Sequence, residues 1–353
     1  MNKIQFIILA VISILLGIIC PFILPERFFF DAILIVDDPY GEKGWIGSYP
    51  INMMLYSITG VAKLPFSIIA ILQLPILFFL LWLIGIPRNF AKFTIKNCLI
   101  FLSFFMMAIF IGQPSKEFMT FIFAAIVVYF FQNNQLSIGV SILITSLLFI
   151  VFGGFYRPYL AFMPFIAFAI YSITRIRFKN RWIMSIFLGF CTILLFSLMY
   201  KVLKGEFFSE MSREFINELR LSRADENSDT IIISPIPVTN FFAEAFATAY
   251  GFVSVNFPIN ALRFFYKPQV MAFVVWQLLL TWIVIVRFGY LLKSFPNYKK
   301  ELWLMSLLLS YFIIQGIFEP DLGSAVRHKI GMLPLIYYLF YYDDFKRKVC
   351  TDK

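Results

Sequence analysis

Charged side chains gather in short segments that interrupt the long apolar runs of this sequence. The segments are VDDPYG at 36–41, GQPSKE at 112–117, GGFYRPY at 153–159, NALRFFYKP at 260–268 and FEPDLGSAVRHK at 318–329. Desolvating a charge beside an apolar helix is costly, so charges that recur at the ends of such runs indicate a binding or catalytic site. We therefore expect these segments to carry the chemistry of the protein.

The basic residues of these segments suit a diphosphate group, because several cations together can neutralise a charged leaving group. Arg157 lies between a glycine pair and a proline, so a sharp turn presents its guanidinium for a two-pronged grip on phosphate. The simpler alternative is that Arg157 only anchors a helix end at the membrane surface. The predicted diphosphate ligands are Lys116, Arg157, Arg263 and Arg327.

The segment GQPSKE predicts the start of a helix, with Pro114 and Ser115 at its mouth. The free amides of that helix end, together with Lys116, favour an anion. The alternative is that Ser115 only caps the helix, while Lys116 and Glu117 extend to water.

Three further residues are candidates for proton transfer. VDDPYG could be a DxD-like metal site, or its Asp38 could act as a general base, because adjacent carboxylates raise one another's pKa. Glu319 is the other candidate base. His328, the only histidine, could shuttle a proton near neutral pH. The plainer readings are that VDDPYG is an ordinary turn and that His328 is a surface group beside other bases.

Several classes of chemistry lack their sequence signatures. The chain has no Walker A segment, no glycine fingerprint of a dinucleotide fold and no G-x-S-x-G. The cysteines at 20, 98, 191 and 350 are far apart and form no CxxC pair. We therefore expect no cofactor and assign no metal ligands, although the sequence leaves the participation of a divalent ion open.

The composition predicts an all-α, polytopic membrane protein that forms a single membrane domain over 1–353. The chain is 61% hydrophobic, with a mean hydropathy of +0.84, so lipid must be the solvent for most of it. Apolar runs of membrane length recur along the sequence. They predict about ten spans, at 5–24, 65–86, 97–112, 117–132, 136–153, 158–174, 182–202, 268–291, 302–318 and 330–342.

The basic residues predict the orientation of these spans, since Lys and Arg of short loops stay in the cytoplasm. They concentrate near the N-terminus and at 88–96, 175–181, 287–300 and 346–353, which places both termini in the cytoplasm. The net charge of +10 is thereby explained by topology, so nucleic acid is not expected as a partner.

Two outer loops are long enough to have a function of their own. The first is 25–50. The second, 203–267, lies between the seventh and eighth spans, and its first half reads as a solvated amphipathic helix. Its second half is apolar but broken by Pro and Gly, which favours a re-entrant or membrane-surface hairpin. The stretch 51–64 is either part of the second span or a separate interfacial helix.

The sequence resembles the bacterial O-antigen polymerases. The resemblance lies in the ten-odd spans, SKE at 115–117, FYRPY at 155–159, FPINALRFFYKPQVMAFVVWQ at 257–277 and FEPDLGSAVRH at 318–328. It implies a GT-C-like membrane enzyme of the bacterial inner membrane, in which 25–50 and 203–267 are periplasmic loops. Members of that family place arginines in two large periplasmic loops, whereas here several short loops and one long loop share them.

The resemblance also implies a reaction and partners. Such an enzyme moves a growing glycan from its lipid carrier to the terminal sugar of the next undecaprenyl-diphosphate-linked repeat unit, building O-antigen or capsule polysaccharide. Membrane lipids, a flippase and a chain-length regulator are the expected partners. The alternatives are an O-antigen ligase or another GT-C glycosyltransferase, or a flippase for the same lipid-linked units. A flippase would show duplicated halves and charges deep within its helices.

Overall fold

The computed structural model describes residues 1–132, 136–175, 178–222, 230–294 and 298–351. Regular structure in these ranges is helical, apart from one antiparallel bridge between Ile231 and Asp321. Helices are the expected outcome for apolar segments, because a helix satisfies its own backbone hydrogen bonds where lipid offers none. Parts of the predicted loops and charge pattern, at 176–177, 223–229 and 352–353, lie outside the described residues.

Six helices of the described chain are long and apolar enough to cross a membrane, as a polytopic membrane protein requires. They are α1 (Asn2–Ile23), α4 (Phe66–Ile84), α7 (Ile138–Phe155), α9 (Arg181–Lys204), α12 (Pro268–Lys293) and α13 (Lys299–Phe318). Two shorter apolar segments are α5 (Ile95–Phe110) and Pro158–Ser172, which contains η3 (Pro158–Phe162) and α8 (Met163–Ser172). The all-helical, multi-pass prediction is confirmed at this level, and the count of ten stays a prediction.

The remaining predicted spans take different forms. The prediction at 117–132 coincides with α6 (Lys116–Gln132). The stretch 330–342 is divided between α14 (Leu322–Gly331), α15 (Leu333–Phe340) and α16 (Tyr342–Thr351). An eight-residue helix such as α15 rises only about 12 Å, so this stretch does not form one helix of membrane length.

The described chain divides into two compact units. The first comprises 1–158 and 327–353, and the second comprises 159–326. In the first unit α1 packs against α4 and α5, while α6 packs against α4, α7 and α15. Gly17 permits the close approach of α1, because a Cβ there would lie 2.5 Å from Leu74 Cδ1.

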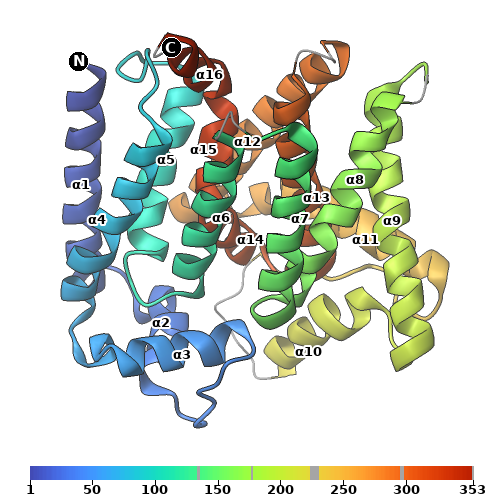
Figure 1. The fold of residues 1–353 in the computed structure, drawn as a ribbon. Helices are drawn as coiled ribbons and strands as arrows, with labels where there is room; N and C mark the ends of the chain where they lie inside the picture. Colours follow the sequence, from blue (N-terminus) through green and yellow to red (C-terminus); the bar gives the residue numbers. More distant parts are fainter. Residues whose placement is uncertain (133–135, 176–177, 223–229, 295–297, 352–353) are drawn as a thin grey trace. The chain divides into compact units, whose positions relative to one another are not determined.

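Two short helices of the first unit lie where α1 ends and α4 begins (Figure 1). The first, α2 (Phe30–Asp37), follows a 3-10 turn, η1 (Glu26–Phe29), and packs against α3 (Ser48–Ile58). A further turn, η2 (Val61–Lys63), and Pro65 separate α3 from α4. The stretch 51–64 is therefore not part of the second span but contains a separate helix.

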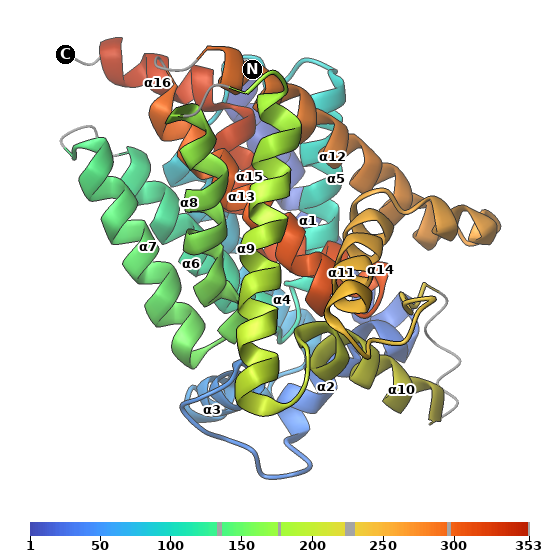
Figure 2. The same ribbon diagram turned by 90° about the vertical axis from the view of Figure 1, so that its right-hand side faces the viewer.

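In the second unit, α13 packs against α8 and α11 (Phe241–Asn256), and α8 packs against α9 (Figure 2). The helix α13 is almost completely buried. The predicted loop 203–267 holds η5 (Glu210–Glu214, a single π-helical turn), α10 (Phe215–Ser222), α11 and η6 (Ile259–Phe264).

The prediction that the loop 203–267 contains helices is confirmed. The prediction that its first half is solvated is wrong for Arg213. That side chain is fully buried, and its hydrogen bonds to the carbonyl oxygens of Gly316 and Ala247 and to Glu214 compensate the cost of burial. The placement of α11 and η6 at a membrane stays a prediction.

Candidate functional site

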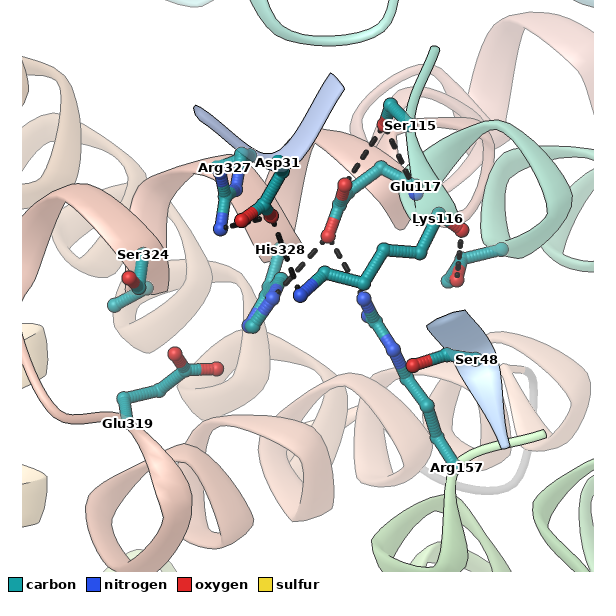
Figure 3. A network of polar contacts seen from close by, with 12 residues as sticks. Asp31, Ser48, Ser115, Lys116, Glu117, Arg157, Glu319, Ser324, Arg327 and His328 are labelled. Atoms are coloured by element: carbon teal, nitrogen blue, oxygen red, sulfur yellow. Dashed lines mark hydrogen bonds and ion pairs between the residues drawn. The ribbon is translucent and has the colours of Figure 1, made fainter. Parts of the chain in front are cut away.

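Six ionisable side chains from four separate segments of the first unit converge in one network (Figure 3). We call it the charged cluster. Its members come from α2, from the start of α6, from the turn after α7 and from the second half of α14. They are Asp31, Lys116, Glu117, Arg157, Arg327 and His328.

The start of α6 fixes two members of the charged cluster. Ser115 Oγ accepts a hydrogen bond from the Glu117 amide at 3.0 Å and donates one to Glu117 Oε2 at 2.7 Å. This is a helix cap that also holds the carboxylate of Glu117. The Ser115 amide donates to the Tyr56 hydroxyl at 3.3 Å, so these amides already have partners within the chain. An anion at the charged cluster would therefore find the Ser115 and Glu117 amides already hydrogen-bonded.

Glu117 is the buried centre of one half of the charged cluster. Its Oε1 lies 2.8 Å from Arg157 Nη2 and 3.2 Å from His328 Nε2. The Glu117 side chain is completely inaccessible and that of Arg157 is 5% exposed. A carboxylate that holds both an arginine and a histidine restricts the histidine ring to one orientation. Glu117 therefore acts as the fixed support of Arg157 and His328.

Asp31 is the centre of the other half. Its Oδ2 lies 2.8 Å from Arg327 Nη2 and 3.2 Å from Lys116 Nζ. Its Oδ1 accepts a hydrogen bond from the Tyr49 hydroxyl at 2.8 Å. Lys116 Nζ also lies 3.7 Å from the centroid of the Tyr49 ring, a cation–π contact. One carboxylate oxygen is thus shared by two cations.

The pKa of Asp31 reports the balance of these charges. Burial by itself would raise the pKa of this carboxyl, but Arg327 and Lys116 outweigh burial. The pKa of Asp31 therefore lies below its usual value, and the group is ionised at neutral pH. With Glu117, the charged cluster then holds two carboxylates against three permanent cations and the histidine.

Neutral hydrogen bonds support the charged cluster from behind. The Tyr156 hydroxyl donates to the Lys116 carbonyl oxygen and accepts from Asn52 Nδ2 at 2.7 Å. The Tyr56 hydroxyl, hydrogen-bonded to Gln73, is buried, and burial raises its pKa to about 12. These tyrosines therefore stay neutral and act as scaffold.

No protein-family model, no curated protein and no solved structure matches this chain. Its chemistry must therefore be read from its own residues. Three cations and a carboxylate-held histidine, largely shielded from water, are suited to binding an anion and moving a proton beside it.

Four of the predicted site residues are brought together by the fold. Lys116, Arg157 and Arg327 are predicted diphosphate ligands, and His328 is a predicted catalytic residue; all belong to the charged cluster. The alternative in which Lys116 and Glu117 extend to water is wrong, because both side chains are buried. Ser115 does cap the helix, as that alternative also held.

Asp38 occupies a turn. It ends α2 with a left-handed backbone (φ 42°), and its Oδ1 accepts a hydrogen bond from the Glu42 amide at 2.7 Å. Its Oδ2 lies 3.5 Å from Lys43 Nζ. These contacts are the ones expected if VDDPYG is an ordinary turn.

Glu319 and Arg263 belong to the second unit. Glu319 is buried at the end of α13 and accepts a hydrogen bond from Gln315 Nε2 at 3.2 Å. Arg263 lies in η6, where its guanidinium stands over the Phe264 ring at 4.8 Å. Their roles in catalysis and diphosphate binding stay predictions.

Asp31 and Glu117 are the functional residues absent from the sequence-based site. A signal for Asp31 exists: it is a single acid within the apolar run FFFDAILIV, where an unpaired charge would be costly. Glu117 directly follows a predicted ligand, and its burial depends on the packing of α6 against α4 and α15. Only the fold shows that these two acids hold the cations.

Proposed function

We propose that this protein is a multi-pass membrane glycosyltransferase that polymerises oligosaccharide repeat units carried on undecaprenyl diphosphate, yielding O-antigen or capsule polysaccharide. In this proposal it resides in the bacterial inner membrane with about ten spans in a GT-C-like fold. Both termini are cytoplasmic, and the charged cluster faces the periplasm. The resemblance of SKE and FYRPY, at 115–117 and 155–159, to O-antigen polymerases supports this assignment.

The observation that carries the proposal is the convergence of Lys116, Arg157, Arg327 and His328 from three separate segments. Solvating charges would be spread over exposed surfaces. These cations are instead largely buried and share two carboxylates, which preserves their charge away from water. Removing these cations from water is unfavourable, and binding of a multiply charged anion would offset that cost.

A lipid diphosphate is a self-activated glycosyl donor, so the protein must stabilise its departure rather than supply a nucleotide site. Lys116 and Arg327 approach a single carboxylate oxygen of Asp31. The same pair would neutralise a phosphate oxygen as the glycosidic bond to the diphosphate breaks. Arg157, held by Glu117, supplies a further positive charge.

His328 is the proposed proton acceptor. The hydroxyl of the acceptor sugar attacks the anomeric carbon of the donor glycan, and a new glycosidic bond forms as the carbon–oxygen bond to the donor diphosphate breaks. The hydroxyl proton passes to His328, and Glu117, 3.2 Å from Nε2, stabilises the imidazolium that results. The released lipid diphosphate leaves with the electron pair of the broken bond.

The proposal is tested in the bacterium that carries this gene. The surface polysaccharide of a deletion strain is resolved as repeat-unit ladders on a gel, after complementation with the wild type or a variant. Arg327→Gln and Arg157→Gln are expected to reduce polymerisation by about 100-fold or more, because each removes a donor to the leaving group. Arg327→Lys should retain part of the activity, since it keeps the charge but loses the planar fork.

Arg27→Gln is the matched control, because Arg27 is exposed and lies outside the charged cluster. Immunoblots of membranes establish that each variant accumulates. Normal ladders from both Arg157→Gln and Arg327→Gln would remove the charged cluster from catalysis.

The deletion strain itself separates the alternatives. Single repeat units attached to lipopolysaccharide, without ladders, indicate a polymerase. Complete polymer left on its lipid carrier indicates a ligase. Lipid-linked single units confined to the cytoplasmic leaflet indicate a flippase. Either of the last two outcomes contradicts the proposal.

A further inference from the structure

The two carboxylates of the charged cluster differ in how firmly they are held. Glu117 is completely inaccessible, and Ser115 fixes it by accepting from its amide and donating to its Oε2. Asp31 is 15% exposed, and its partner Arg327 is 20% exposed. Tyr49 donates a neutral side-chain hydrogen bond to Asp31 Oδ1. Asp31 therefore occupies the more accessible and less constrained half.

The position of Asp31 is also where an anion would bind. Lys116 Nζ and Arg327 Nη2 both approach Oδ2, at 3.2 and 2.8 Å. Two cations that converge on one oxygen are equally suited to an oxygen of a phosphate group. A phosphate group carrying more than one negative charge would interact with both cations more strongly than one carboxylate does.

We propose that Asp31 is a built-in competitor, whose carboxylate holds the place of a phosphate group between Lys116 and Arg327 until a diphosphate displaces it. This inference rests on the proposed function for the identity of that anion. Asp31 then performs two tasks. It keeps the two cations compensated when the site is empty, and it sets a threshold that weakly charged anions do not pass.

The position of Asp31 in the chain suits displacement. It lies in the first turn of α2, a helix of eight residues that follows the 3-10 turn η1 and ends in the turn at Asp38. The backbone around Asp31 is itself packed, because Phe29 and Ala32 form a buried cluster with Cys20 of α1. Displacement therefore requires only a change in the Asp31 side-chain rotamer, not a shift of the helix. Glu117 lies instead at the start of α6, which packs against α4 and α15.

The test measures binding of inorganic pyrophosphate to the purified full-length protein in detergent, by titration calorimetry. Asp31→Asn should bind pyrophosphate about tenfold more tightly than the wild type, because a site filled by its own side chain about nine-tenths of the time shows a dissociation constant raised by that factor. Asp37→Asn is the matched control. It removes the same charge from the exposed end of the same helix and should bind as the wild type does.

The outcomes separate this inference from the proposed function. If Arg327→Gln weakens pyrophosphate binding but Asp31→Asn does not tighten it, the competitor role is wrong and the diphosphate site stands. If neither Arg327→Gln nor Arg157→Gln weakens binding, the proposed function loses its site. No measurable binding to either the wild type or Asp31→Asn overturns the competitor role as well.

Two further ligands identify the source of the phosphate. Farnesyl diphosphate should show the same gain on Asp31→Asn as pyrophosphate. A gain with phosphatidylglycerol but with neither diphosphate would mean that lipid headgroups fill the site, and would overturn the assignment to a diphosphate.

A second variant covers the case in which Asp31→Asn does not fold, since it leaves Lys116 and Arg327 without their shared carboxylate. Tyr49→Phe keeps the ring beneath Lys116 but removes the hydroxyl that holds Asp31 Oδ1. It should tighten pyrophosphate binding by less than Asp31→Asn would. Unchanged or weaker binding by Tyr49→Phe contradicts the competitor role.

Discussion

Arg157 in the first unit and Arg213 in the second are both buried, yet their N–H groups end on different acceptors. Arg157 donates to Glu117, a carboxylate that also contacts His328. Arg213 donates to two backbone carbonyl oxygens, at 2.6 Å to Gly316 and 3.1 Å to Ala247, and twice to Glu214. The first arginine belongs to an ionic network, and the second joins backbone elements.

The chain explains why Gly316 needs such a donor. In a continuous helix its carbonyl oxygen would accept the amide of residue 320, but residue 320 is proline and has no N–H. The guanidinium of Arg213 replaces that missing donor at the end of α13. Burial and charge alone therefore do not identify a functional arginine. The acceptors of its N–H groups decide whether it is structural or available to a ligand.

The largest expected effect on stability tests the structural member of this comparison. Arg213→Met should lower the free energy of unfolding by about 3–5 kcal/mol, because it leaves Glu214 and the Gly316 carbonyl oxygen without their buried partner. The measurement is the thermal unfolding of the detergent-purified protein. Lys204→Met, at an exposed position, is the control. Unfolding of Arg213→Met at the wild-type temperature would show that Arg213 does not join these elements.

The next effect concerns the helix crossing that surrounds Arg213. A Cβ at Gly251 of α11 would lie 1.8 Å from the Gly316 carbonyl oxygen and 1.9 Å from Arg213 Nη1. Gly251→Ala should therefore cost about 1–3 kcal/mol of stability, as overpacking typically does, because a backbone atom must move.

Gly289, inside α12, is the matched control for Gly251, because a Cβ there meets nothing within 4 Å. Gly289→Ala should stabilise by about 0.5–1 kcal/mol, since alanine loses less backbone freedom in a helix. Equal effects of the two substitutions, measured by thermal unfolding, would contradict the close crossing of α11 and α13.

Acid should act on the charged cluster through Asp31. Its pKa in the folded protein lies below the value of about 3.9 in an unfolded chain, so its ion pairs stabilise the fold above about pH 4. That contribution is lost as pH falls toward the folded pKa, at about 1.4 kcal/mol for each unit between the two pKa values. Melting temperatures measured from pH 7 to pH 3 should therefore fall less steeply for Asp31→Asn than for the wild type.

Asp37→Asn serves again as the control and should keep the wild-type slope, because Asp37 is exposed and makes none of the contacts of Asp31. The same slope in all three proteins would mean that the pKa of Asp31 does not depend on its two cations.

Asp321 is a comparable buried carboxyl in the second unit. Burial alone would raise its pKa, but Arg220 lowers that pKa below its usual value.

The sequence predicts the helices well because lipid leaves an apolar run few alternatives. The prediction at 182–202 matches α9, and that at 65–86 matches α4, because uninterrupted apolar composition sets both length and position. The prediction at 330–342 was less successful, since breaks at Met332 and Tyr341 divide the apolar stretch. Gly331 and Pro334 are the sequence signals for the first break, and hydropathy alone overlooks them.

The site was only partly predictable. Lys116, Arg157, Arg327 and His328 stand out as charges beside apolar runs. The same criterion also selected residues outside the charged cluster, namely Asp38, Glu319 and Arg263. Their pairing is not encoded locally, because Asp31 and Arg327 are far apart in the chain and meet through the packing of the first unit. Arg213 shows the same limit. It lies in a segment that the sequence predicts to be a solvated amphipathic helix, yet its side chain is fully buried.

The smallest effect sharpens the boundary between scaffold and site. Tyr156→Phe removes the hydroxyl that donates to the Lys116 carbonyl oxygen. It should cost only about 1 kcal/mol, the usual net contribution of one neutral hydrogen bond. The remaining groups keep other partners: Thr120 Oγ1 donates to the same carbonyl oxygen at 3.3 Å, and Asn52 donates to the Ser48 carbonyl oxygen at 2.6 Å. Tyr40→Phe, at an exposed tyrosine, is the control for thermal unfolding.

If pyrophosphate binding by Tyr156→Phe falls more than tenfold while its melting temperature barely changes, the Tyr156 hydroxyl positions Lys116 for the ligand. The Tyr156 hydroxyl would then serve the ligand site, as Arg157 does. Loss of a structural contact, such as those of Arg213, should instead lower stability before it affects binding.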